Sequence, residues 1–141
     1  MRKALLLITL AILAAPATAQ PPRPAAPVLS GIELLRADFT ARSGTDTVYF
    51  GSDSAQLGAP AKAVLTAQAM WLRQHPEVMV RIEGHGDPSD TRDHAIAVGA
   101  RRAEEVRDNL VLLGVPALQL NAVSWGKERP GAGRAVTVLA R

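Results

Sequence analysis

Cysteine is absent from this 141-residue chain, and aromatic side chains make up only 4% of it. Without a thiol, the protein can form no disulfide, bind no metal through thiolates and carry out no cysteine-based catalysis. The same absence excludes a lipid attached to an N-terminal cysteine. Any function must therefore come from hydroxyl, imidazole, carboxylate and cationic groups, or from the backbone.

The chain has a single long apolar run, and it lies at the amino terminus. Two basic residues precede an apolar stretch from Ala4 to Ala15, and small residues follow at Ala17-Thr18-Ala19. This order is typical of a secretory signal peptide, so we expect residues 1–19 to be removed. An uncleaved membrane anchor is the alternative, but a spanning helix needs about 20 apolar residues. No later segment has the length and hydropathy to span a membrane, so we expect an exported protein without a covalent anchor.

The expected mature chain carries almost no net charge. Of the 16 basic side chains, 14 remain once Arg2 and Lys3 are removed, against 13 acidic ones, which leaves a formal charge of +1. Proteins that bind nucleic acid through phosphate contacts normally carry a strongly basic surface. We therefore expect no nucleic-acid partner.

Residues 20–45 are predicted to form a tether followed by a segment at the domain edge. The stretch from Gln20 to Ser30, QPPRPAAPVLS, is rich in proline and alanine. This composition disfavours regular secondary structure and is typical of an extended linker. The pattern from Gly31 to Asp46 is ambiguous, and its leucine and isoleucine residues suggest a short strand or turn that packs on the domain edge.

Residues 46–141 are predicted to form one folded domain. VMVRIEG, which begins at Val78, alternates apolar and polar residues like a half-buried strand, and TVYF, which begins at Thr47, is β-branched and aromatic. Apolar residues recur at steps of three and four in two other stretches, as in helices that bury one face. The expected elements are strands at 47–50, 78–84, 120–125 and 135–139 and helices at 60–74 and 93–113. The order β-α-β-α-β-β predicts an α/β fold in two layers, with helices packed on a mixed four-stranded sheet.

Two oppositely charged residues are placed to act together. Asp87 comes just after a predicted strand, and Arg102 lies on the helix that follows. The helical period puts Arg102 at the edge of the apolar stripe, whereas Arg101 points away from it. Arg102 can therefore pack its stem on the domain and direct its head at Asp87. Such a pair can grip a zwitterion, because a guanidinium fork matches a carboxylate and an acid attracts an ammonium group. Recognition of this kind needs no nucleophile or metal.

Four stretches of the sequence resemble a known family. They are VYFGSDSAQLGAPAKAVL from Val48, VRIEGHGD from Val80, GARRAEEVRDNLVLLGV from Gly99, and SWGKERP from Ser124 followed by RAVTV from Arg134. In this order and spacing they resemble the OmpA-like peptidoglycan-binding domain, most closely its peptidoglycan-associated lipoprotein (Pal) branch. The resemblance covers nearly all of the predicted domain.

The resemblance implies a non-enzymatic protein that holds the cell wall without covalent chemistry or a cofactor. It implies a pocket for meso-diaminopimelate of the peptidoglycan stem peptide, in which Asp87 takes the ligand's ammonium group and Arg102 its carboxylate. It also implies a periplasmic location, associated with the outer membrane or the wall at most through a partner. The residues expected to support the pocket are His85, Gly86, Asp90, Asp93 and Arg134.

The chain departs from the family pattern around this pocket. The family usually has Tyr-Asn where this chain has His94-Ala95, so one polar contact to the ligand is missing. Pro88-Ser89-Asp90 replaces Glu-Arg-Gly, Ala100 replaces a glutamate, and the loop at Gly131–Gly133 is short. We therefore expect a weakened pocket.

Simpler roles are open for the two charged residues. Asp87 is also placed to cap the following helix, as aspartates at such positions commonly do. Arg102 is also placed to pair with Glu105 one turn along the same helix.

Two other function classes are open as well. A degenerate pocket would leave a protein-interaction module, since Pal-type proteins also bind the periplasmic protein TolB. Alternatively, His and carboxylate side chains between positions 85 and 94 suggest a metal-dependent hydrolase, although their spacing matches no recognised ligand motif. That candidate metal cluster consists of His85, Asp87, Asp90, Asp93 and His94.

Overall fold

A computed structural model describes residues 29–130 and 133–140 of the chain. The predicted signal peptide and most of the predicted tether lie outside these residues. Within the described residues, no helix is both long and apolar enough to cross a membrane. The elements are helices α1 (Gly31–Ser43), α2 (Ala59–Gln74) and α3 (Arg92–Leu112), a short 3-10 helix η1 (Ala117–Gln119), and strands β1 (Thr47–Tyr49), β2 (Val80–His85), β3 (Leu120–Gly126) and β4 (Arg134–Leu139).

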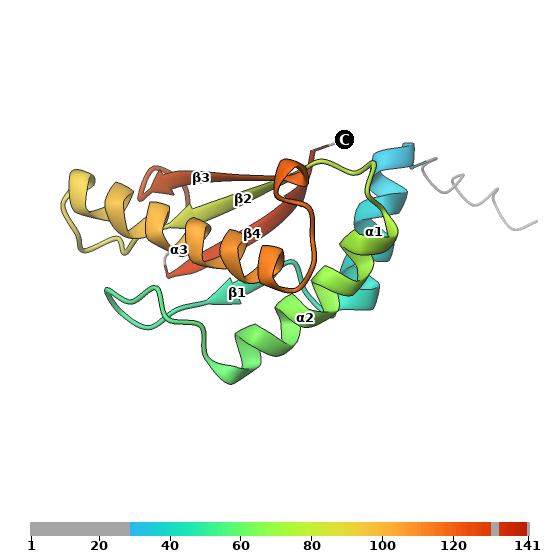
Figure 1. Ribbon diagram of the computed structural model, residues 1–141. Coiled ribbons are helices and arrows are strands. Elements are labelled where there is room, and N and C mark those ends of the chain that lie inside the picture. Colours follow the sequence, from blue (N-terminus) through green and yellow to red (C-terminus); the bar gives the residue numbers. More distant parts are fainter. Residues whose placement is uncertain (1–28, 131–132, 141) are drawn as a thin grey trace, which may run out of the picture.

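The four strands form one mixed sheet in the order β1-β4-β2-β3. Strand β2 runs parallel to β3 and antiparallel to β4, and β1 runs antiparallel to β4. Figure 1 shows α3 lying along the sheet, while α1 and α2 cross one another at one end of the molecule. The predicted two-layer α/β fold is confirmed, and the predicted strands and helices end within two residues of the observed ones.

The prediction of a short strand or turn after Gly31 was wrong, because this segment is helix α1. The helix begins with a capping box, in which the backbone N–H of Ser30 donates to Glu33 Oε2 at 2.7 Å. Gly44 follows its end at a φ of +81°, a conformation that glycine adopts without strain. On the inner face of α1, Phe39 is 1% exposed. Its ring packs edge to face on that of Trp71 in α2, with the two ring centres 5.2 Å apart. Residues 31–43 are therefore part of the packed structure.

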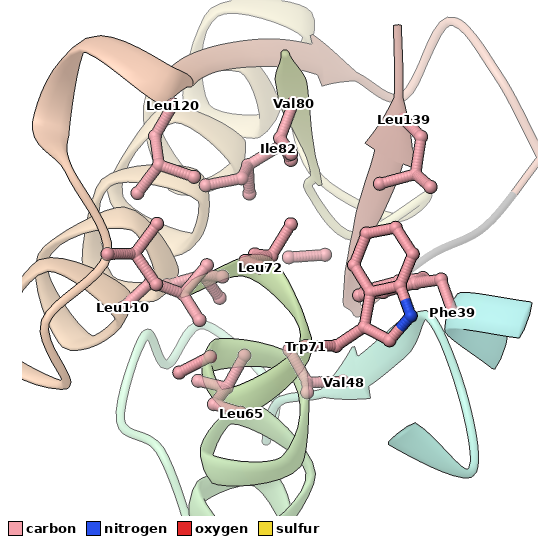
Figure 2. Packing of buried hydrophobic residues seen from close by; sticks show 14 of the residues in the cluster. Phe39, Val48, Leu65, Trp71, Leu72, Val80, Ile82, Leu110, Leu120 and Leu139 are labelled. Carbon is pink, nitrogen blue, oxygen red and sulfur yellow. The ribbon is translucent and has the colours of Figure 1, made fainter. Parts of the chain in front are cut away.

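The hydrophobic core lies between the helices and one face of the sheet. Alternate residues of the central strand, Val80 and Ile82, turn inward and are at most 2% exposed. They belong to one core cluster with Leu72 of α2 and Leu110 of α3, both fully buried, as Figure 2 shows. Burial of one such side chain contributes about 1.5–3 kcal/mol. This core fixes α3 on β2, and so fixes the position of any side chain that α3 directs toward the end of β2.

Candidate functional site

Asp87 and Arg102 lie in direct contact. Nη1 of Arg102 is 3.1 Å from Oδ1 of Asp87, and it joins the middle of α3 to the loop that follows β2. Both simpler roles for these residues are wrong. Thr91, not Asp87, caps α3, since its hydroxyl accepts from the backbone N–H of His94 at 3.3 Å. The hydrogen bonds of Arg102 go to Asp87 and to backbone carbonyls, and none goes to Glu105.

Glycines bring α3 unusually close to β2. A Cβ at Gly84 would lie 1.8 Å from the carbonyl oxygen of Gly99, and a Cβ at Gly86 would lie 2.4 Å from that of Ala95. The two backbones therefore touch directly, which only glycine allows. Ala95 is fully buried in this contact. Ala95, which stands where the family usually has asparagine, therefore lies in the close contact between α3 and the end of β2.

The guanidinium of Arg102 is enclosed by protein. Its side chain is 0% exposed, and its carbon lies 5.5 Å from the centre of the Phe50 ring. Besides Asp87, its hydrogen bonds go to the carbonyls of Ser54 at 2.8 Å, His85 at 2.7 Å and Gly51 at 2.9 Å. Arginine has five N–H donors, and four of them make these bonds. Arg102 therefore ties the loop after β1, the end of β2 and Asp87 into one unit.

Both carboxylate oxygens of Asp87 accept hydrogen bonds. Oδ2 accepts from the backbone N–H of Asp53 at 2.9 Å, and Oδ1 accepts from Arg102. These two contacts, with the Asp53 N–H as the larger cause, lower the pKa of Asp87 below its usual value. The carboxylate is thus anionic at neutral pH. Its side chain is 14% exposed, so one edge of it reaches solvent while its partner Arg102 does not.

Two of the expected supporting residues contribute through the backbone. The carbonyl of His85 accepts from Arg102, while its ring is buried and burial, followed by the charge of Arg134, lowers its pKa. Gly86 donates its N–H to the carbonyl of Gly126 at 2.8 Å, which ties the Asp87 loop to the end of β3.

In the described part of the chain, the side chains of the other three expected supporting residues form no hydrogen bond or ion pair with Asp87 or Arg102, although the backbone N–H of Asp90 donates to the Asp87 carbonyl at 3.2 Å. The carbonyl of Asp90 accepts a hydrogen bond from Lys127 Nζ at 2.6 Å, which ties the loop after β2 to the residue that follows β3. Arg134 begins β4 and donates to the carbonyl of Pro130 at 3.0 Å. Asp93 is exposed in the first turn of α3, where its charge favours the helix dipole.

Sequence reasoning missed the loop from Gly51 to Ser54. It treated this segment as punctuation between a strand and a helix, yet the loop supplies two carbonyls to Arg102 and one N–H to Asp87. Asp53 also contacts the ring of His94, with Nε2 2.6 Å from Oδ1. An acidic residue in a short polar loop directly after a strand was the available signal, because such loops often carry function.

The candidate metal cluster assembles only in part. Asp90 and His94 do come together, but with Asp53 in place of the other three residues. Within the part of the chain that the structure describes, Asp53, Asp90 and His94 are the group whose possible ligand atoms all lie within 4.8 Å of one another. Asp53 and His94 are exposed at the surface, where such groups commonly occur without an ion.

Part of the missed loop lines a cleft of about 630 Å³. Gly51 and Ser54 line it, and so do Lys62 of α2 and Glu105 of α3, which carry opposite charges. The carbonyls of Gly51 and Ser54 also accept from Arg102, so the same two residues line this cleft and contact the guanidinium.

The fold and the matched residues identify the family. A model of the OmpA family matches residues 49–138, which include all four strands in whole or part and both Asp87 and Arg102. The chain belongs to the OmpA family. The family resemblance found in the sequence is thereby confirmed.

Similar OmpA-family proteins bear the name peptidoglycan-associated lipoprotein. The one from Rhizobium meliloti is 43% identical over 113 residues, which cover 72% of this chain and 64% of that protein. The one from Pseudomonas aeruginosa is 42% identical over 95 residues, 67% of this chain and 56% of that protein. The chain thus spans less than two thirds of the length of these relatives.

Solved structures show the same fold. The crystal structure of the peptidoglycan-associated lipoprotein from Burkholderia pseudomallei is 37% identical, with a TM-score of 0.65 over 67% of this chain and 90% of that one. The C-terminal domain of Helicobacter pylori MotB gives a TM-score of 0.63 at 20% identity over 68% of this chain and 84% of that one, and shows the fold alone.

Proposed function

We propose that this chain binds peptidoglycan non-covalently in the periplasm, and that it contributes in this way to the integrity of the cell envelope. The observation that supports this most is its 43% identity, over 113 residues, to a protein named for its association with peptidoglycan. The Asp87–Arg102 pair at the end of β2 supplies the chemistry. It is a fixed acid beside a fixed base, as recognition of a zwitterion requires.

In this proposal the ligand group is meso-diaminopimelate of the stem peptide. Its ammonium group approaches the exposed edge of Asp87, which the contacts from Asp53 and Arg102 keep anionic. Its carboxylate takes the place of the loop carbonyls on Arg102, and backbone amides between Gly86 and Asp93 complete the site. Charge-assisted hydrogen bonds contribute about 1.5–3 kcal/mol each, so one stem is held weakly. Many stems on one sacculus raise the overall hold.

Co-sedimentation with purified sacculi tests this proposal. We expect the mature domain to pellet with diaminopimelate-type sacculi and to pellet less with lysine-type sacculi. Asp87→Asn keeps the shape of the side chain and removes its charge, so it should abolish pelleting. Arg101→Ala removes an exposed arginine next to Arg102 and should pellet like the wild type. Wild-type protein that stays in the supernatant with both kinds of sacculi would refute wall binding.

A protein-interaction module is the second candidate, and the enclosure of Arg102 favours it. Backbone carbonyls already occupy guanidinium donors of Arg102, so this pocket offers a ligand fewer free donors than an open pocket would. The probe for this candidate is purified TolB. Binding of TolB by a domain that does not pellet with sacculi would support it.

A further inference from the structure

The loop from Gly51 to Ser54 closes over the site proposed above. The carbonyls of Gly51 and Ser54 occupy Nη2 and Nε of Arg102, and the N–H of Asp53 occupies Oδ2 of Asp87. These are the groups that a zwitterionic ligand would use. The ligand can therefore engage both residues only if this loop moves away.

One residue of the loop adopts a left-handed backbone conformation. Asp53 has a φ of +51°, and it is the one non-glycine residue with a positive φ in the described part of the chain. A side chain in this left-handed region costs free energy unless surrounding contacts hold it there. Aspartate adopts this region more readily than most residues, and one contact from outside the loop already holds it, since its N–H donates to Asp87 Oδ2 at 2.9 Å.

The ring of His94 provides such a contact from a different element. Its Nε2 lies 2.6 Å from Oδ1 of Asp53, and the two side chains are 44% and 63% exposed. The first turn of α3, which carries His94, is itself capped by Thr91 and so is a fixed support. Asp90 is the other charged group beside the ring, with its Oδ2 at 4.0 Å from Nε2.

We propose that His94 is a positioning residue that pins the loop from Gly51 to Ser54 over Arg102. This inference rests on the proposed function. Release of Asp53 from His94 lets the loop lift, which exposes the Arg102 donors and frees one oxygen of Asp87. Only molecules with the loop open can bind a stem peptide. The measured affinity is therefore the affinity of the open form multiplied by the fraction of molecules that are open. A residue that pins the loop thus weakens ligand binding, whereas a residue that contacts the ligand strengthens it.

Amide hydrogen exchange on the protein alone is the first test. His94→Phe keeps a ring but removes the contact to Asp53, so the Asp53 amide should exchange faster while the core strands stay unchanged. His94→Gln can still donate to Asp53 and should restore slow exchange, and Arg101→Ala on the exposed face of α3 should change nothing. Equal exchange of the Asp53 amide in wild type and His94→Phe would overturn the proposal.

Binding kinetics with a soluble stem peptide that contains meso-diaminopimelate are the second test. Loss of an exposed contact of this kind shifts the equilibrium between closed and open loop by a roughly two- to fivefold factor. His94→Phe should therefore bind the stem peptide tighter by about that factor, through faster association. Weaker or unchanged binding by His94→Phe would overturn the pinning role. If neither protein binds the peptide but exchange at Asp53 rises, the pinning role stands and wall binding fails.

Discussion

Replacement of Arg102 should destabilise the fold strongly, whatever its role in binding. In Arg102→Met the side chain keeps much of its length but loses all four hydrogen bonds. The carbonyl of His85, a residue only 3% exposed, would lose its partner at a cost of about 1–3 kcal/mol. The carboxylate of Asp87 would lose its counter-charge, and breaking a buried pair costs about 3–5 kcal/mol.

These costs do not simply add. Asp87 is 14% exposed, and the loop at Gly51 is exposed too, so water can replace part of what Arg102 supplied. We therefore expect a total loss of about 3–5 kcal/mol in the free energy of unfolding. That is a large share of the roughly 5–15 kcal/mol that holds a typical domain together. Arg102→Lys should fall in between, because one ammonium group cannot reach acceptors on three sides.

Urea unfolding followed by tryptophan fluorescence measures this loss, since Trp71 is 2% exposed in the core. With a slope of about 1.5–2 kcal/mol per molar urea, the midpoint should fall by roughly 1.5–3 M. Arg101→Met is the matched control and should stay within about 0.5 kcal/mol of the wild type. A loss below about 1 kcal/mol in Arg102→Met would refute the stabilising role of the hydrogen bonds around Arg102. Loss of wall binding in an Arg102 variant is informative only where the protein is shown to be folded.

Two further perturbations test other parts of the structure. Burial lowers the pKa of His85, so the unfolded chain takes up a proton there more readily than the folded protein does. The free energy of unfolding is therefore unaffected by protonation of this residue above the unfolded pKa of 6.5, and it declines as the pH falls from there toward the lower folded-state pKa. Urea midpoints measured between about pH 7.5 and 5 should slope less in His85→Phe than in wild type, and equal slopes would contradict this cause. Gly84→Ala places a Cβ 1.8 Å from the Gly99 carbonyl, so thermal unfolding should show a loss of several kcal/mol. Gly58→Ala meets ordinary contact at 3.7 Å and serves as control.

Residue types and their periodicity were enough to predict the four strands, α2 and α3, and to place Arg102 on the side of α3 that can reach Asp87. Those features depend on which residues are apolar and on the helical and strand repeats, both of which are visible in a sequence. Helix α1 could have been found from its capping box at Ser30 and Glu33 and from the spacing of Ile32, Leu35 and Phe39. The family resemblance starts only after this segment, so it gave no help there.

The closing of the loop over Arg102 had no comparable signal. Three of the four acceptors of Arg102 are backbone carbonyls, which every residue carries, so no residue type announces them. Whether an arginine head is free or enclosed is decided by the path of a loop that lies about 50 positions away in sequence. The sequence therefore indicated which residues meet, but not that one of them is already satisfied.

The enclosure of Arg102 separates two contributions that a single substitution would merge. Its bonds to His85 and Asp87 join α3 to the end of β2 and can persist when a ligand arrives. In the proposed binding mode, its bonds to Gly51 and Ser54 compete with the ligand carboxylate and are given up. Substitutions at Arg102 change both sets at once, whereas under the pinning proposal substitutions at His94 change only how firmly the competing set is held. That proposal therefore predicts that a change at position 94 alters ligand affinity while the fold is left intact.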